Sequence, residues 1–305
     1  MNLIRVFMAL LLLFAVASPT GVKAEPFTFT VPPVDDVEDV HGDPANPDLV
    51  VFMAGNQFMV MDDLMAAFQT AHPEVKRIFF ETFPPGIVAR QIAAGGIRLG
   101  NLVVTTPPDV FLSGHGRMLK MVEGGLVGKP FAYATNNLAI MVAKGNPLHI
   151  TGMKDLGKPN VRVSMPNPEW EGIGKQIVAA YKLAGGPTLV DEIMTAKVKS
   201  GSTILTRIHH RQTPLAILDG RADAGPVWIS EGMYQVKLGK PIEFVKLADA
   251  QNVTGKYEAA MMSKPLHEKA GKAFLEFLVT PAAQAIYRAY GFTTLSQTPK
   301  SPEKE

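Results

Sequence analysis

The sequence predicts an α/β protein built from two doubly wound lobes, and three observations support this fold class. Segments with the apolar pattern of strands alternate three times with segments of helical period between residues 49 and 122. A short turn of Gly, Pro or Asn closes each of these strands. A second series of strands and helices begins near residue 136. Such alternation is typical of parallel sheets covered by helices on both faces.

The first series is recognised by its apolar periods and its turns. The run LVVFMA at 49–54 predicts a strand, and a Gly-Asn pair closes it. A helix follows because apolar residues recur at three- and four-residue spacing from Phe58 to Phe68, and it ends before Pro73. Two further strand–helix pairs are expected at 75–82 with 87–94 and at 109–113 with 118–122.

The second series follows from the same signals. Its strands are expected at 138–143, 161–165, 202–208, 224–229, 242–247 and 257–262. Its helices are expected at 172–183, from 212 to 218, at 266–278 and at 281–290. The last residues, 295–305, are polar and rich in Pro, which predicts a frayed tail.

The first 24 residues have the pattern of a secretory signal. Arg5 supplies a positive charge, an apolar run extends from Phe7 to Ala17, and small side chains precede a cleavage site after Ala24. The run is too short to cross a bilayer. Cysteine is absent, so neither lipid attachment nor a disulfide is available. We therefore expect cleavage after Ala24 and a soluble protein exported to the periplasm.

Charge and motifs exclude several function classes. Removing residues 1–24 takes away Arg5 and Lys23 but no acid, so 30 basic and 28 acidic residues become 28 of each. This balance argues against nucleic acid or a charged membrane surface as partner. The sequence has no GxSxG, no P-loop lysine, no GxGxxG after a strand and no cysteine nucleophile. It therefore predicts a protein that is not an enzyme and needs no cofactor.

A ligand in such a fold is expected beyond the carboxyl ends of the strands, where helix amino-termini converge. These termini carry unpaired N–H groups and partial positive charge, so they favour anions. Asn56 stands at such a position and either caps the following helix or turns its amide to the ligand. Trp228 ends an apolar strand and is either a core aromatic or a wall closing over the ligand.

His209-His210-Arg211 is the densest chemical signal in the chain. The two imidazoles donate to an anion beside the Arg211 charge in one interpretation. In another they bind a transition metal, with Glu169, Glu171 or His115 completing the ligand set. In a third they are structural, one packed and one solvated. The spacing matches no established zinc motif.

Seven segments together resemble the solute-binding proteins of ABC importers, in the group similar to the molybdate-binding proteins. The matching segments, in family order, are VFMAG at 51–55, VARQIAAG at 88–95, PDVFLS at 108–113, NLAIMVA at 137–143, NPE at 167–169, GRADAGPVW at 220–228 and LVTPAAQAIYRAYGF at 278–292. The similarity covers residues 49–293.

The resemblance implies a type II periplasmic binding protein fold, with two lobes joined by two hinge strands. It implies capture of a small inorganic oxyanion by hinge closure, followed by docking on an ABC permease in the inner membrane, with the binding protein a monomer. The expected divisions are 1–24 signal peptide, 25–48 extended leader, 49–132 plus 255–293 lobe I, 133–254 lobe II and 294–305 tail.

The resemblance also implies that hydroxyl and N–H groups hold the oxyanion. Carried over by position, these contacts fall on Asn56, the segment 84–86, Ile173, His210 and Trp228. The ligand-binding candidates are Gly55, Asn56, Gly86, Ile173, His209, His210, Arg211 and Trp228. Because several family hydroxyls are missing, a metal or chelate held by His209, His210 and Glu169 is an alternative. An exported sensor or a metal-dependent enzyme on the same fold is another.

Overall fold

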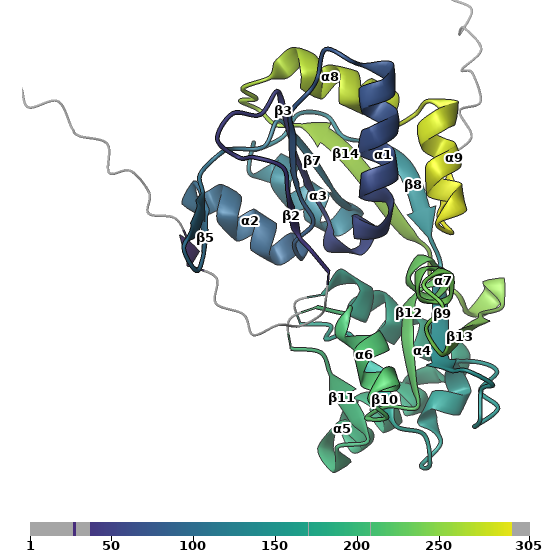
Figure 1. Cartoon of the computed structure of the whole chain (residues 1–305). Helices are drawn as coiled ribbons and strands as arrows, with labels where there is room; N and C mark the ends of the chain where they lie inside the picture. The colour runs from purple at the N-terminus through teal and green to yellow at the C-terminus, as the bar shows by residue number, and fades with distance from the viewer. Residues whose placement is uncertain (1–26, 29–36, 170, 208, 295–305) are drawn as a thin grey trace, which may run out of the picture.

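The computed structural model describes residues 27–28, 37–169, 171–207 and 209–294. The expected signal segment 1–24, its cleavage site and the tail beyond residue 294 lie outside the described residues, as does part of the expected leader. No helix within the described ranges is long and apolar enough to cross a membrane. Figure 1 shows two lobes, one above the other, each built around its own sheet.

The upper lobe in Figure 1 contains a seven-stranded sheet in the order β15-β8-β14-β7-β3-β4-β2. Strands β3, β4 and β7 are parallel, as the three predicted strand–helix units require. The flanking strands β14, β8, β15 and β2 pair antiparallel, so the sheet is mixed. The strands are β2 (Val40–His41), β3 (Leu49–Met53), β4 (Ile78–Glu81), β7 (Val110–Gly114), β8 (Phe131–Asn136), β14 (Gly255–Met261) and β15 (Thr293–Thr294).

Five helices cover the two faces of this sheet. Successive residues of β3 point to opposite faces, so Val51 and Met53 pack under one set of helices while Val50 and Phe52 pack under the other. The first set is α1 (Phe58–Ala71), α8 (Glu268–Phe277) and α9 (Pro281–Ala289), and the second is α2 (Pro85–Ala94) and α3 (His115–Glu123). The lobe therefore has a core on each face of its sheet.

The lower lobe contains a five-stranded sheet in the order β11-β10-β12-β9-β13. Its strands are β9 (Leu138–Ala143), β10 (Val163–Met165), β11 (Thr203–Leu205), β12 (Ala224–Trp228) and β13 (Ile242–Lys246). Its helices are α4 (Gly172–Asp191), α5 (Lys197–Ser200), α6 (Gln212–Leu218) and α7 (Ile229–Lys237). The helix expected at 172–183 is followed by a kink at Gly186, whose φ of 68° is not helical, and a further helical segment then reaches Asp191. The strand expected at 202–208 is limited to β11.

The chain passes between the lobes twice, from β8 into β9 and from β13 into β14. Because β8 lies wholly in the first sheet, we place the first passage at Asn137 instead of residue 133. The domain bounds remain a proposal. Part of the expected leader joins the first lobe, where β2 pairs with the edge of β4 and His41 stacks on Phe80 with ring centroids 4.3 Å apart.

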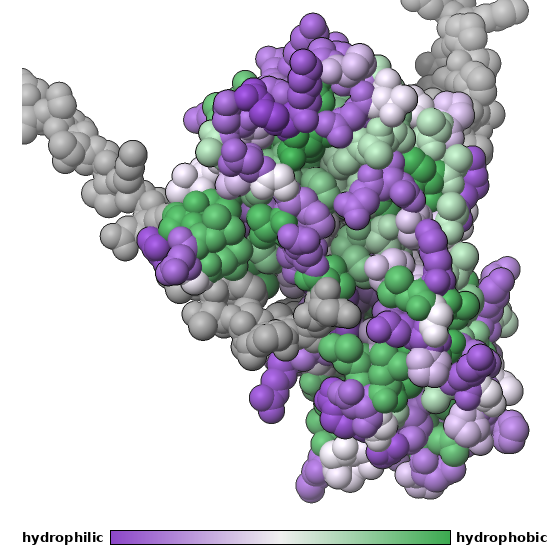
Figure 2. Space-filling model, viewed as in Figure 1, coloured by the Kyte–Doolittle hydropathy of each residue, from purple (hydrophilic) through white to green (hydrophobic). Residues whose placement is uncertain are grey.

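A small third sheet lies beside the first lobe. It consists of β1 (Phe27–Thr28), β5 (Ile97–Leu99) and β6 (Leu102–Val104). Leu102 and Val103 are exposed here, and Figure 2 shows an apolar area in the region where Figure 1 places β5. This area lies at the left edge of the upper lobe in both views. The remaining short turns of helix are η1 (Gly55–Gln57), η2 (Met153–Gly157), η3 (Glu192–Ala196) and η4 (Asp249–Gln251).

Candidate functional site

The carboxyl ends of strands from both sheets meet at the boundary between the lobes. The segments that follow β3 and β4 in the first lobe face those that precede α4, α6 and α7 in the second. Direct contacts cross the boundary, including the edge-to-face pair of Phe58 and Tyr234, whose ring centroids are 5.0 Å apart. The lobes are therefore in contact at the position where the sequence predicts a ligand.

Arg211 binds a carboxylate of the opposite lobe. Its Nη1 and Nη2 donate to the two carboxylate oxygens of Asp39 at 3.0 and 2.8 Å, and the Thr82 hydroxyl donates to the same carboxylate at 2.8 Å. The guanidinium also lies 5.3 Å from the ring centroid of Phe58. Arg211 is only 6% exposed. Arg211 therefore already binds an anionic group in the region where the sequence predicts ligand contacts. Its partner, Asp39, comes from the expected leader.

His210 lies between two buried carboxylates. Its Nδ1 is 2.8 Å from Glu171 and its Nε2 is 2.7 Å from Glu231. The backbone N–H of His210 also donates to Glu171 at 2.6 Å, and the Thr206 hydroxyl donates to the second oxygen of Glu171. Burial alone lowers the pKa of His210, but Glu231 and Glu171 outweigh it and raise the pKa to about 9. His210 is therefore an imidazolium at neutral pH.

His209 has a different environment, although it is adjacent in the chain. Its ring stacks on His210 with centroids 3.8 Å apart, and its Nδ1 accepts the backbone N–H of Arg211 at 3.2 Å. This bond assigns the remaining ring proton to Nε2. Burial, followed by the charges of His210 and Arg211, lowers the pKa of His209 well below its usual value. The pair thus consists of one neutral and one charged imidazole.

Gly55 allows the two lobes to approach closely. A Cβ built on Gly55 would lie 2.6 Å from the Thr82 carbonyl oxygen and 3.0 Å from His209 Nε2. A larger residue would clash with the Thr82 carbonyl of its own lobe and would also press against His209 of the other lobe. The structure gives this predicted ligand residue a role in lobe contact.

Asn56 does not cap the following helix. Neither η1 nor α1 has a side-chain cap, and the Asn56 amide instead donates to the hydroxyl of Tyr257 in β14. Both side chains are buried. The capping interpretation is therefore wrong for this residue, and Tyr257 is a neighbour that sequence reasoning missed.

Gly86 is the second residue of α2, and a cation lies beside it. The Arg117 Nη2 atom is 3.8 Å from the position that a Cβ on Gly86 would take. Burial lowers the pKa of Arg117, and within the described part of the chain no carboxylate pairs with it. Arg117 was not among the sequence candidates, although it follows the third strand directly. By contrast, Ile173 at the start of α4 packs its side chain into the second core.

Trp228 belongs both to a core and to the wall between lobes. Its side chain packs in the core of the second lobe and its ring meets Tyr257 edge-on, with centroids 6.1 Å apart. The ring also covers Gly255 at the start of β14. The core interpretation of Trp228 is therefore confirmed, and its role as a wall over a ligand stays a prediction.

Gly255→Ala is expected to destabilise the protein. The added Cβ would lie 2.3 Å from Cη2 of Trp228, so the ring must move, at a cost of about 1–3 kcal/mol for overpacking. Urea unfolding measures this loss. The control is Gly116→Ala in α3, where no atom lies within 4 Å of the added methyl group. Equal stability of the two variants would contradict the described Trp228 contact.

A group of three metal-binding side chains lies in the second lobe. Ligand atoms of Glu171, His209 and His210 all lie within 4.8 Å of one another, and we call these residues the histidine cluster. Glu169, the carboxylate chosen from sequence, is exposed and outside the cluster. His115 is half exposed and pairs with Glu258 at 2.8 Å. Glu171 therefore takes the place predicted for Glu169.

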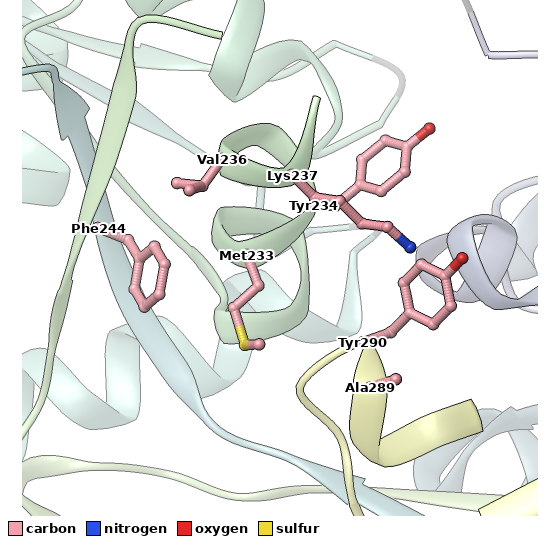
Figure 3. Close-up of a pocket in the computed structure, with 7 residues that line it drawn as sticks. All are labelled: Met233, Tyr234, Val236, Lys237, Phe244, Ala289 and Tyr290. Carbon is pink, nitrogen blue, oxygen red and sulfur yellow. The ribbon is translucent and has the colours of Figure 1, made fainter. Parts of the chain in front are cut away.

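A pocket of about 360 Å³ lies elsewhere, between α7 of the second lobe and α9 of the first (Figure 3). Its walls are mostly apolar, and Lys237 Nζ lies 4.1 Å from the ring centroid of Tyr290. The lining residues are Met233, Tyr234, Val236, Lys237, Phe244, Ala289 and Tyr290. None of the predicted ligand residues lines it. Its apolar chemistry does not suit a small inorganic anion.

Comparison with known proteins identifies relatives of this architecture. A family model described as bacterial extracellular solute-binding protein matches residues 49–293. The molybdate-binding protein ModA of Mycobacterium tuberculosis is 25% identical over 232 residues, covering 74% of this chain and 81% of that protein. The thiosulfate-binding protein of Escherichia coli is 29% identical over 174 residues, covering 53% of this chain and 49% of that protein.

A solved structure has the same fold. The sulfate-binding protein SubI from Mycobacterium tuberculosis superposes with a TM-score of 0.67 at 20% identity, covering 82% of this chain and 87% of that chain. The predicted α/β fold, a type II periplasmic binding protein with two lobes, is thereby confirmed.

Proposed function

The chain belongs to the family of bacterial extracellular solute-binding proteins, and from this membership we propose that it captures a small oxyanion between its lobes for an ABC importer. In this role it works in the periplasm, performs no catalysis and uses no cofactor. Relatives named for molybdate and thiosulfate support an oxyanion as the ligand class.

The observation that carries the proposal is the arrangement around Arg211. A guanidinium that donates two parallel N–H bonds to a carboxylate has the geometry that also suits a tetrahedral oxyanion. The Thr82 hydroxyl adds a neutral donor from the other lobe. An oxyanion that takes the place of the Asp39 carboxylate would therefore touch both lobes and hold them closed.

The charges favour an anion that carries more than one negative charge. Arg211 pairs with Asp39 here, and Arg117 beside Gly86 adds a cation at the start of α2. Two cations and a helix amino-terminus compensate a dianion better than a monoanion. This differs from the resemblance, which implies binding by neutral donors alone. We therefore propose the oxyanion class and leave its member to the binding assay.

A ligand screen tests the proposal. The exported protein is titrated with molybdate, tungstate, sulfate, thiosulfate and phosphate, with chloride as the salt control, and followed by calorimetry and thermal unfolding. At 100 times its dissociation constant a ligand stabilises the fold by about 2.7 kcal/mol. We expect one oxyanion to bind with 1:1 stoichiometry and to be recovered unchanged. If none of them binds, the proposed ligand class is wrong.

The proposed partner is a permease in the inner membrane, which accepts the closed binding protein. A signalling protein that reads the same closed form is the alternative partner. Loss of oxyanion uptake on deletion of the gene supports the permease. Normal uptake with an altered transcriptional response to the oxyanion supports the sensor.

A further inference from the structure

The histidine cluster is buried on the second lobe, next to the Arg211 arrangement but distinct from it. Glu171, His209 and His210 are 7%, 1% and 5% exposed, and they come from the segment before α4 and the turn before α6. Glu231, at the start of α7, is buried against the same imidazole. All four side chains belong to one lobe, and Gly55 of the other lobe lies against His209 Nε2.

Two buried acidic side chains converge on one imidazole in this group. Glu171 and Glu231 are buried and contact the two ring nitrogens of His210 at 2.8 and 2.7 Å. Buried carboxylates are costly unless cations compensate them. Arg211, the nearby guanidinium, is held by Asp39. A divalent cation bound here would compensate both carboxylates.

The two nitrogens of His210 are placed as a metal-binding histidine requires. Such a histidine binds the metal through one nitrogen and donates its other N–H to a carboxylate. Here Glu231 Oε1 lies 2.7 Å from Nε2, as an ion-pair neighbour without the alignment of a hydrogen bond, and Glu171 Oε2 lies 2.8 Å from Nδ1. Two zinc ligands at about 2.0–2.1 Å from the ion stand roughly 3 Å apart. In the tetrahedral geometry of zinc this distance is about 3.3 Å, so Glu171 and His210 Nδ1 need to separate by about half an ångström.

His209 supplies a buried nitrogen without a partner. Among the described residues, no hydrogen bond is made by its Nε2 atom. Its Nδ1 accepts the Arg211 N–H at 3.2 Å, near the long end of the hydrogen-bond range. Metal binding would give up that bond as the ring turns or its proton moves. An unpartnered buried polar atom is costly, and a ligand removes this cost.

We propose that Glu171, His209 and His210 bind a divalent transition metal such as Zn²⁺, and that Glu231 orients His210 for it. One carboxylate and two imidazoles are a ligand set that zinc takes in proteins. This site is additional to the proposed oxyanion site. It does not require the oxyanion.

Cobalt titration tests this site without any oxyanion present. The exported protein, purified without a histidine tag and stripped of metal, is titrated with Co²⁺ and followed by visible absorption; Zn²⁺ then displaces the Co²⁺. We expect one equivalent of Co²⁺ with the intense absorption of a four-coordinate ion. Glu171→Gln and His210→Ala are expected to lose this signal. Glu231→Gln is expected to bind about 10- to 100-fold more weakly.

Glu169→Gln is the matched control, because it removes the neighbouring exposed carboxylate of the same loop. It is expected to bind Co²⁺ like the parent protein. Circular dichroism of the metal-free variants establishes that they are folded. Absence of Co²⁺ binding by the parent, or equal binding by Glu171→Gln and Glu169→Gln, overturns the proposal. Because no oxyanion takes part, this result is independent of the ligand screen.

Discussion

Arg211→Met is expected to weaken oxyanion binding by about a hundredfold or more. The variant removes two hydrogen bonds from a buried charged donor, and each such bond contributes about 1.5–3 kcal/mol. A loss of about 3 kcal/mol corresponds to roughly a hundredfold in the dissociation constant. Calorimetry with the best oxyanion of the screen measures the change. Arg221→Met is the control, since Arg221 is exposed in the same lobe and pairs with exposed Asp219.

The variant Asp39→Asn distinguishes two roles of Arg211, namely direct contact with the oxyanion and the ion pair that bridges the two lobes. Both Arg211→Met and Asp39→Asn break the ion pair between the lobes, but only the first removes the guanidinium. If Arg211 contacts the oxyanion, Asp39→Asn keeps the affinity or raises it, because a competing carboxylate is gone. Equal weakening in both variants would show that the bridge, and not the contact, accounts for the loss at Arg211.

The strand–helix units were predictable because their signals are local. The apolar run at 49–54, the helical period from Phe58 and the Gly/Pro turns each act within a few residues. Since parallel strands direct their carboxyl ends to one edge, Gly55, Asn56 and Arg211 could be assigned to the boundary region without coordinates. We propose a lobe boundary a few residues after residue 133, because β8 lies in the first sheet and nothing local in the sequence marks it as such.

The partners of the site residues were not predictable in the same way. Asp39 and Arg211 are 172 residues apart, and Asn56 and Tyr257 are 201 apart. Packing of one lobe on the other brings the first pair together, and the strand order of the first sheet brings the second pair together. The choice between Glu169 and Glu171 depended on a turn in which the Glu169 N–H bonds to the Asn167 side chain. That turn leaves Glu169 exposed and directs Glu171 to His210.

A buried carboxyl group in the first lobe provides the second large expected effect. Glu81 ends β4 and is 0% exposed. Gln91 Nε2 donates to its Oε1 at 3.0 Å, while Oε2 has no partner among the described residues. Burial raises the pKa of Glu81 from 4.5 to about 8, and the nearby charge of Asp39 adds to the increase. The folded protein therefore holds a proton here that the unfolded chain releases near its ordinary pKa.

This difference makes the free energy of unfolding fall as pH rises. Below about pH 4.5 both states are protonated at Glu81, so the group costs nothing. Between pH 4.5 and about 8 only the folded state keeps the proton, and stability declines with pH. At about 1.36 kcal/mol per unit of pKa, the full penalty above pH 8 is on the order of 5 kcal/mol.

Glu81→Gln is expected to remove this decline, because an amide provides an N–H without titrating. The variant should match the parent protein near pH 4.5 and exceed its stability by up to about 5 kcal/mol near pH 8.5. Urea unfolding across this range measures both slopes. Glu123→Gln, at the exposed end of α3, should leave the parent slope unchanged. If Glu81→Gln retains the parent slope, another group causes the pH dependence and Glu81 is not the buried proton carrier.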